Sequence, residues 1–305
     1  REGVEVRLLA DSMGMKVKKK GLHEFTQAGG KHAVFFPRIF TINYRNHRKF
    51  AVIDGTTGFI GGFNIGEEYL GRGPFGSWRD AAIRINGMGV MGLQLRFIMD
   101  WNYAAREHLE IDPVYFPMVP GKGRCPLQTV WSGPDVRFSQ IKDGYVKLIL
   151  TAQESVYIQT PYFIPDDSLA DALRIAALSG VDVRVMIPCR PDHPFVYWAS
   201  LSFIGDLLDA GVKAYTYDAG FIHAKSIVVD GIGASVGSAN FDVRSFRLNF
   251  EANAFFYDPL YGSQLKQAFL DDLPKCTEIT PGSYQSRSRW TRTRESVSRL
   301  FSPLG

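Results

Sequence analysis

Short runs rich in β-branched residues alternate along this chain with longer segments of helical periodicity. The runs that predict strands in the first part are VEVRLLA, FAVID, GFIGG and AAIRI, which cover residues 4–10, 50–54, 58–62 and 81–85. The matching runs in the second part are VDVRVMI, SIVVD, ASVGS and ANAFFY, which cover residues 181–187, 226–230, 234–238 and 252–257. Apolar spacing predicts helices over Met91–Arg106, Gln140–Gln153, Ser168–Leu178, Phe195–Ala210 and Leu260–Leu273. The alternation predicts an α/β protein.

One stretch of the chain occurs twice. HRKFAVIDGTTGFIGGFN starts at His47, and HAKSIVVDGIGASVGSAN starts at His223, 176 residues later. The same offset relates four further pairs: Lys49 and Lys225, Asp54 and Asp230, Gly61 and Gly237, and Asn64 and Asn240. Upstream, GVEVRLLAD from Gly3 matches GVDVRVMIP from Gly180 at an offset of 177. The sequence therefore consists of two copies of one α/β unit.

The two copies are separated by EIDPVYFPMVPGKGRCP, which is rich in proline and glycine and reads as a linker. We expect residues 1–124 to hold the first unit with the linker, and residues 125–305 the second unit with its tail. A strand and a helix precede GVDVRVMIP in the second copy, whereas nothing comparable precedes GVEVRLLAD. We therefore expect about 35 residues of the first unit to lie outside this sequence.

The repeated H-x-K spacing carries the chemistry. Residues two apart on a strand face the same side, so each imidazole shares a face with an ammonium group. The pairs are His47 with Lys49 and His223 with Lys225. Face to face, the copies would form one phosphodiester site, in which one histidine attacks phosphorus and the other protonates the departing alkoxide. An alcohol or water would then enter by the reverse route. The amides of Asn64 and Asn240 can donate to the same phosphate oxygens.

Carboxylates near the motifs have two readings each. Asp80 in SWRDAAIRI and Glu251 in NFEANAFFY occupy comparable places after the two motifs, with five more residues in the first copy. They could orient the two imidazoles through the far ring nitrogen, or be ordinary surface carboxylates at strand starts. Asp54 and Asp230 precede glycine at strand ends, so closing a turn is at least as well founded for them as a catalytic role.

Composition narrows the class of protein. The 305 residues are 45% hydrophobic and 22% charged, as in folded globular proteins. Three widely spaced cysteines argue against a disulfide framework or a structural zinc site. No apolar run reaches 18 residues, so we expect no segment of this sequence to span a bilayer as a helix. No H-E-x-x-H motif occurs, and because the two lysines supply cationic charge we expect catalysis without a metal or other cofactor.

The last 22 residues carry five arginines and one glutamate, a net charge of +4 that equals the net charge of the whole chain. The remainder is near neutral, so a basic groove for nucleic acid is not expected. From Trp290 the tail places Trp290, Val297, Leu300, Phe301 and Leu304 near helical spacing. It is either a basic amphipathic helix at an anionic membrane surface or a helix docked on the protein. The apolar stretch around Phe195, Tyr197 and Trp198 is either a buried helix or an aromatic wall beside acyl chains.

The doubled H-x-K-x4-D motif resembles that of the phospholipase D superfamily. The flanks NYRNHRKFAVIDG, TGFIGGFNIGEEYLG, SWRDAAIRINGMGV, TPYFIPDDSLADAL, GFIHAKSIVVD, VGSANFDVRSFRLNFEAN and RLFSPLG look like those of bacterial cardiolipin synthases of the phospholipase D type. The resemblance covers almost the whole chain. It implies two tandem pseudo-symmetric units, each a β-sheet flanked by helices, with the active site at their interface.

The resemblance also implies an activity. Such enzymes move a phosphatidyl group between two phosphatidylglycerol molecules and release cardiolipin and glycerol. His47 and His223 would then be the catalytic pair, with precedent for His47 as nucleophile, which the repeat symmetry leaves open. Family members are anchored to the bacterial inner membrane by N-terminal hydrophobic helices that are missing here, so we interpret the chain as truncated. The alternatives are a phospholipase D or other phosphodiesterase that uses water, and a non-catalytic lipid-binding module. The oligomeric state stays open.

Overall fold

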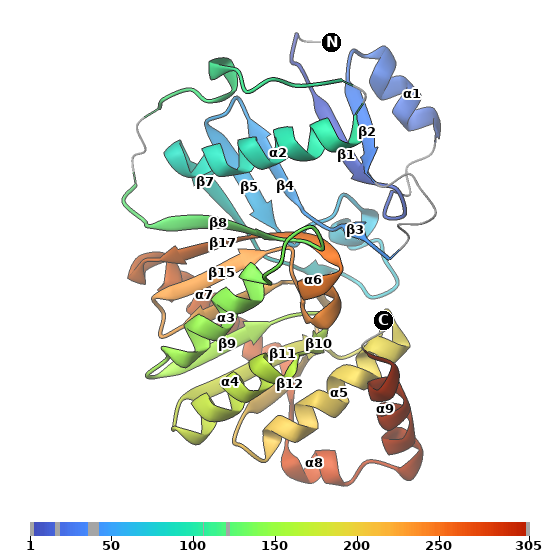
Figure 1. Ribbon diagram of the computed structural model, residues 1–305. Helices are drawn as coiled ribbons and strands as arrows, with labels where there is room; N and C mark the ends of the chain where they lie inside the picture. Colours follow the sequence, from blue (N-terminus) through green and yellow to red (C-terminus); the bar gives the residue numbers. More distant parts are fainter. Residues whose placement is uncertain (1–2, 16–18, 36–42, 106, 120–122, 303–305) are drawn as a thin grey trace.

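The computed structural model describes residues 3–15, 19–35, 43–105, 107–119 and 123–302 (Figure 1). The first unit forms the upper half of Figure 1 and the second unit the lower half, with β8 and β17 where they meet. In the described part of the chain, no helix is long and apolar enough to cross a membrane.

In its described residues, the first unit has two small sheets, two α-helices and two short strands that pair with the second unit. Its elements are β1 (Arg7–Asp11), α1 (Lys19–Gln27), β2 (Lys31–Phe35), β3 (Arg45–Asn46), β4 (Phe50–Ile53), β5 (Thr57–Gly61), β6 (Trp78–Arg79), β7 (Ala82–Asn86) and α2 (Val90–Ala104). Strands β1 and β2 pair in parallel, whereas β4, β5 and β7 form an antiparallel sheet. Helix α2 covers both sheets through Leu93, Ile98 and Trp101, which are almost fully buried.

The second unit is built on one large mixed sheet in the order β18-β12-β11-β9-β14-β15-β17, with β8 also paired to β17. Its strands are β8 (Leu127–Ser132), β9 (Ser155–Gln159), β10 (Phe163–Ile164), β11 (Asp182–Pro188), β12 (Lys213–Tyr217), β13 (Phe221–Ile222), β14 (Ser226–Val229), β15 (Gly233–Gly237), β16 (Phe241–Asp242), β17 (Asn249–Tyr257) and β18 (Cys276–Ile279). Its helices are α3 (Gln140–Leu150), α4 (Asp167–Leu178), α5 (Pro194–Leu208), α6 (Val243–Arg247), α7 (Pro259–Asp272), α8 (Pro281–Gln285) and α9 (Arg289–Phe301).

Alternating side chains of this sheet divide the core into two layers. Ile158 and Ile227 belong to the cluster that includes α3, α4 and α5, whereas their neighbours Tyr157 and Val228 belong to the cluster that includes Phe269 of α7. Because residues on a strand alternate between faces, each central strand is apolar on both sides. The sheet is therefore covered by helices on both faces.

The repeat seen in the sequence is a repeat of structure. Strands β4 and β5 correspond to β14 and β15 at the same 176-residue offset. The predicted fold of two pseudo-symmetric α/β units is confirmed. The two units also share a hydrophobic core. Ile60 and Leu93 of the first unit pack in one buried cluster with Ala252 and Ala254 of β17. The boundary at residue 124 stays a prediction.

The predicted elements differ from the structure mainly at their ends. The helix expected over Met91–Arg106 is α2, which ends at Ala104 because Ala105 is extended; Arg106 lies outside the described residues. The helix expected over Gln140–Gln153 stops at Leu150. Sequence analysis missed α1, β2, β12 and β18. These short elements carry polar residues at positions where the apolar pattern would have signalled them.

Candidate active site

Two short parallel strand pairings bring the repeated motifs together. Strand β3 pairs with the start of β17, and the backbone N–H of His47 donates to the carbonyl oxygen of Phe250 at 2.9 Å. Strand β13 pairs with β6 in the same way, and the N–H of His223 donates to the carbonyl oxygen of Arg79 at 2.7 Å. Each histidine therefore enters the site beside the residue that precedes the other unit's carboxylate.

The imidazole–carboxylate pairs cross between the units. His47 Nδ1 lies 2.8 Å from Glu251 Oε1 and 3.0 Å from Oε2, and His223 Nδ1 lies 2.7 Å from Asp80 Oδ2. A carboxylate on Nδ1 holds the proton at that nitrogen and leaves Nε2 for the substrate. This is the contact that the orienting hypothesis for Asp80 and Glu251 requires. Each half of the site is thus completed by the opposite unit.

Both carboxylates are buried and hydrogen-bonded. Glu251 is fully buried and also accepts hydrogen bonds from Ser238 Oγ at 2.5 Å and Asn249 Nδ2 at 3.1 Å. Burial alone would raise the pKa of Glu251, but the charge and hydrogen bond of His47 and the charge of Lys49 outweigh it, so the pKa is lowered. Burial opposes ionisation of Asp80 too, yet His223 and Lys225 lower its pKa. Both groups therefore stay ionised.

Tyr69 is a site residue that sequence analysis missed. Its hydroxyl lies 2.9 Å from Asp80 Oδ2, to which it donates, and 2.9 Å from His223 Nδ1. It lies between the first motif and Asp80, where the first copy has five residues more than the second. That excess was the available signal. In the second unit Ser238 and Asn249 take the corresponding place on Glu251, so the supporting groups of the two half-sites differ.

The two lysines lie within the cluster and are desolvated. Lys49 Nζ donates to the carbonyl oxygen of His47 at 2.7 Å, and Lys225 Nζ donates to that of His223 at 2.5 Å. Lys225 has no exposed surface. Burial lowers the pKa of Lys49 to about 8 and that of Lys225 to about 7, against the pull of the nearby carboxylates. Two desolvated lysines, Lys225 buried and Lys49 half-buried, favour the binding of an anion.

The same surroundings suppress protonation of the imidazoles. Burial, then the charge of Lys225, lower the pKa of His223 to about 3. Desolvation also lowers the pKa of His47, although Glu251 opposes it. The His47 side chain keeps 28% of its surface exposed and the His223 side chain 8%, so His47 lies nearer the rim. Both rings are therefore neutral near pH 7.

The two asparagines are not equivalent. Asn240 is buried, and its Oδ1 has no hydrogen-bond partner within the described residues. Asn64 lies in the loop that follows β5 and is exposed. The expectation that Asn64 and Asn240 bind phosphate stays a prediction, with the buried Asn240 the better placed of the two.

The structure does not bring Asp54 and Asp230 to this cluster. Both have a positive φ, 52° and 54°, and each is followed by a glycine in the same region, as in a two-residue hairpin turn. Asp230 also accepts hydrogen bonds from the backbone N–H groups of residues 153–155 at 2.8–2.9 Å. It lies five residues beyond Lys225 along an extended strand, about 16 Å away. The turn geometry supports a structural role for both residues, and their catalytic assignment stays a prediction.

Arg48, within the first motif, forms contacts that hold this segment against α2 and β17. It lies between His47 and Lys49 in the segment that joins β3 to β4, pairs with Asp100 of α2 at 2.9 Å and donates from Nε to the carbonyl oxygen of Glu251. Its counterpart in the second copy is Ala224. The buried ion pair joins α2 to the segment that carries His47, and the hydrogen bond joins the same segment to β17, which carries Glu251.

Comparison with known proteins agrees with this architecture. The family model described as "Cardiolipin synthase, PLD-like domain" matches residues 1–73 and 145–273. The chain is 55% identical over 312 residues to the major cardiolipin synthase of Bacillus subtilis, covering 100% of this chain and 65% of that protein. It is 52% identical over 311 residues to a cardiolipin synthase of Listeria innocua, covering 99% and 64%. The chain thus spans slightly less than two thirds of the length of these curated relatives.

Among solved structures, the fold is similar to that of a phosphatidylserine synthase from Haemophilus influenzae. The TM-score is 0.70 at 14% identity, and the match covers 98% of this chain and 80% of the other. At that identity the likeness concerns the fold alone.

Proposed function

The chain belongs to the cardiolipin synthase family with a phospholipase D-like domain, and from that premise we propose that it transfers a phosphatidyl group from one phosphatidylglycerol to the terminal hydroxyl of another. The products are cardiolipin and glycerol. The observation that carries the proposal is the crossed arrangement in which His47 pairs with Glu251 and His223 pairs with Asp80, with the half-buried Lys49 and the buried Lys225 bonded to the two histidine carbonyls. Such an arrangement provides a nucleophile, an acid and an anion site at one place.

In the first step, Nε2 of His47 attacks phosphorus of the bound phosphatidylglycerol. The P–N bond forms as the P–O bond to the head-group glycerol breaks, and Nε2–H of His223 gives its proton to the departing glycerol oxygen. We assign His47 as nucleophile by the family precedent. The negative phosphodiester offsets the charges of Lys49 and Lys225, which raises the pKa of His223 from the low value that burial and Lys225 impose.

In the second step, neutral His223 removes the proton from the terminal hydroxyl of a second phosphatidylglycerol. The alkoxide oxygen attacks phosphorus, the P–N bond breaks, and His47 is restored. Lys49, Lys225 and the amide of Asn240 hold the non-bridging oxygens and stabilise their charge in both transition states. Asn64 acts in the same way from the first unit once substrate is bound.

The substrates are lipids, so we propose that the protein works at an anionic membrane surface, the bacterial inner membrane. Water competes with the lipid alcohol for the phosphohistidine at any such surface. A site whose mouth lies against the bilayer receives the acceptor from the lipid and limits hydrolysis.

Product analysis tests the proposal. The chain is incubated with phosphatidylglycerol vesicles, and the lipids are separated and identified by mass spectrometry. We expect cardiolipin and glycerol in equal amounts. Phosphatidic acid with glycerol would instead identify a phospholipase D. The absence of any product would favour the third alternative, a non-catalytic lipid-binding module. A His108→Ala variant, altered at an exposed histidine outside the cluster, is the matched active control.

Chelation is expected to leave turnover unchanged. In the proposed mechanism Lys49 and Lys225 supply the positive charge that a metal ion supplies elsewhere. Turnover on phosphatidylglycerol vesicles is measured with and without EDTA, at constant ionic strength. Complete loss of turnover that one divalent ion restores would contradict the lysine-based mechanism.

Replacing Tyr69 by Phe is expected to shift the pH profile. The variant removes a hydrogen bond to Asp80, so more of the carboxylate charge acts on His223 and raises its pKa. We expect kcat to fall about threefold to tenfold and the alkaline limb to move to higher pH by about half a unit. A Phe63→Leu variant alters packing against Tyr69, 5.0 Å between ring centroids, without removing a hydroxyl. Equal shifts in both variants would assign Tyr69 a packing role only.

A further inference from the structure

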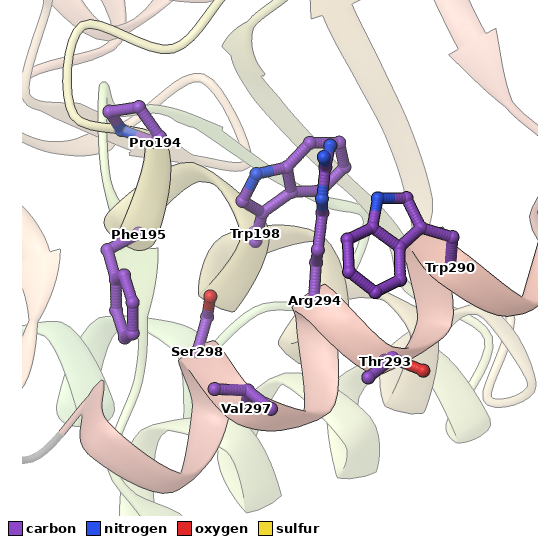
Figure 2. Close-up of a pocket in the computed structure, with 8 residues that line it drawn as sticks. All are labelled: Pro194, Phe195, Trp198, Trp290, Thr293, Arg294, Val297 and Ser298. Atoms are coloured by element: carbon purple, nitrogen blue, oxygen red, sulfur yellow. The ribbon is translucent and has the colours of Figure 1, made fainter.

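A groove outside the active site runs between α5 and α9 (Figure 2). Its volume is about 500 Å³. From α5 it is lined by Pro194, Phe195 and Trp198, and from α9 by Trp290, Thr293, Arg294, Val297 and Ser298. The walls are almost entirely apolar, and two indoles flank the single charged group.

Helix α9 is attached to the protein by polar contacts. Glu295 and Ser298 are its buried residues, and Glu295 pairs with Arg287 at 2.8 Å. Arg299 forms a second ion pair, with Asp206 of α5. Part of the helix thus docks on the protein, as one of the two interpretations of the tail predicts. The other interpretation describes the side of the same helix that borders the groove.

The side of α9 that borders this groove exposes large apolar side chains. Trp290 is 64% exposed, Phe301 48% and Val297 45%. Trp290, Arg294, Val297 and Phe301 follow the spacing i, i+4, i+7 and i+11, which places them in one stripe along the helix. Phe195 of α5 continues the stripe, with its ring 6.2 Å from that of Phe301. A contiguous patch of this kind on a protein surface marks an interaction site.

Arg294 gives the patch its charge. Its guanidinium lies 5.7 Å from the ring centroid of Trp198 and 5.1 Å from that of Trp290. Unlike Arg287 and Arg299, it has no carboxylate partner within the described residues. An unpaired cation between two indoles, beside exposed aliphatic and aromatic side chains, is complementary to an anionic lipid head group above acyl chains.

Helix α5 starts close in sequence to a residue that acts on the active site. Burial lowers the pKa of Lys225, and the charge of Asp192, two residues before Pro194, weakly opposes this. Tyr162 Oη donates to Asp192 at 2.5 Å and holds this loop. Of the three aromatics expected in an aromatic wall, Phe195 and Trp198 line the groove. Tyr197 does not, because its hydroxyl turns inward and donates to the carbonyl oxygen of Cys189.

We infer that the groove between α5 and α9 is an interfacial binding site for an anionic phospholipid surface. Trp198 and Trp290 lie at the level of the head groups, Arg294 contacts lipid phosphate, and Phe195, Val297 and Phe301 enter the acyl region. The inference rests on the proposed function only in that the substrate is a phospholipid. It identifies the face of the protein that meets the bilayer.

Vesicle co-sedimentation tests this, in a His47→Ala background that removes turnover. The probes are phosphatidylcholine vesicles with and without an equal part of phosphatidylglycerol. We expect a Trp290→Ser/Val297→Ser/Phe301→Ser variant to bind both kinds at least tenfold more weakly. Arg294→Gln is expected to weaken binding about fivefold only where phosphatidylglycerol is present. The matched controls are Leu150→Ser/Leu178→Ser, which removes exposed leucines from α3 and α4, and Arg174→Gln.

Undiminished vesicle binding by the groove variants, or equal losses in the controls, would overturn the inference. Light scattering on the same proteins tests the other possible occupant, a second copy of this chain. A dimer that the groove variants dissociate, without loss of vesicle binding, would make the groove an interface between copies. Because turnover plays no part in these measurements, the inference can fail while cardiolipin is still formed. Equally, absence of cardiolipin in the product assay leaves the binding result standing.

Discussion

Replacing either His47 or His223 by Ala is expected to lower turnover of phosphatidylglycerol by about 10⁴-fold. The two rings perform different steps on the same phosphorus, so neither can substitute for the other. Each ring is held by a carboxylate of the opposite unit, at 2.7–3.0 Å. Initial rates of glycerol release measure the effect, with circular dichroism to verify that each variant folds.

The control for this pair is His108→Ala, which is expected to retain full turnover. A second control mixes the His47→Ala and His223→Ala chains, and no activity is expected because one site needs both histidines of one chain. Near-normal rates in either single variant would contradict a shared site. Recovery of activity in the mixture would require the two motifs to come from different chains.

Replacing Lys225 by Met is expected to lower kcat/KM by about 10²- to 10³-fold and, at pH 6, to stabilise the protein. Burial lowers the pKa of Lys225 to about 7, from a usual 10.5. The charged lysine therefore costs the folded state several kcal/mol at low pH, since one pKa unit corresponds to about 1.4 kcal/mol. Loss of its hydrogen bond to the His223 carbonyl offsets about 1–3 kcal/mol of that gain. We expect a net stabilisation of about 2 kcal/mol.

The pH dependence of stability tests whether burial of the charged Lys225 causes this stabilisation. In the unmodified protein the folded state loses the proton near pH 7 and the unfolded state near pH 10.5, so stability rises with pH across that window. The advantage of Lys225→Met is therefore full below pH 7 and shrinks towards pH 10. Thermal unfolding at pH 6, 8 and 10 measures it, with the half-exposed Lys213→Met as control. A variant less stable than the parent at pH 6 would show that Lys225 supports the fold instead.

The repeated motif makes the centre of the site predictable from sequence. Positions two apart on a strand share a face, so His47 with Lys49 and His223 with Lys225 follow from spacing alone. The doubling implies that two half-sites meet. Asp80 and Glu251 could be named because they stand at comparable places after the two motifs. All of these depend on residues close together in the chain.

What could not be predicted depends on pairing between distant segments. Glu251 reaches His47 across 204 residues because β17 pairs with β3, and short strands such as β3 and β6 carry no periodic signal. Arg48 is buried because Asp100 of α2 faces it, although an arginine within a strand suggests an exposed face. The turn role of Asp230 required its φ and its three backbone donors.

Trapping the covalent intermediate tests the central claim most directly. Turnover of labelled phosphatidylglycerol is quenched, under conditions that preserve P–N bonds, and the labelled peptide is identified by mass spectrometry. We predict one phosphatidyl group per chain, on His47 alone, with accumulation in a His223→Ala variant supplied with a substrate whose leaving group needs no protonation. Label on His223 alone would exchange the two roles within the same site. Label on both histidines equally, or on neither, would contradict a single site built by the two units.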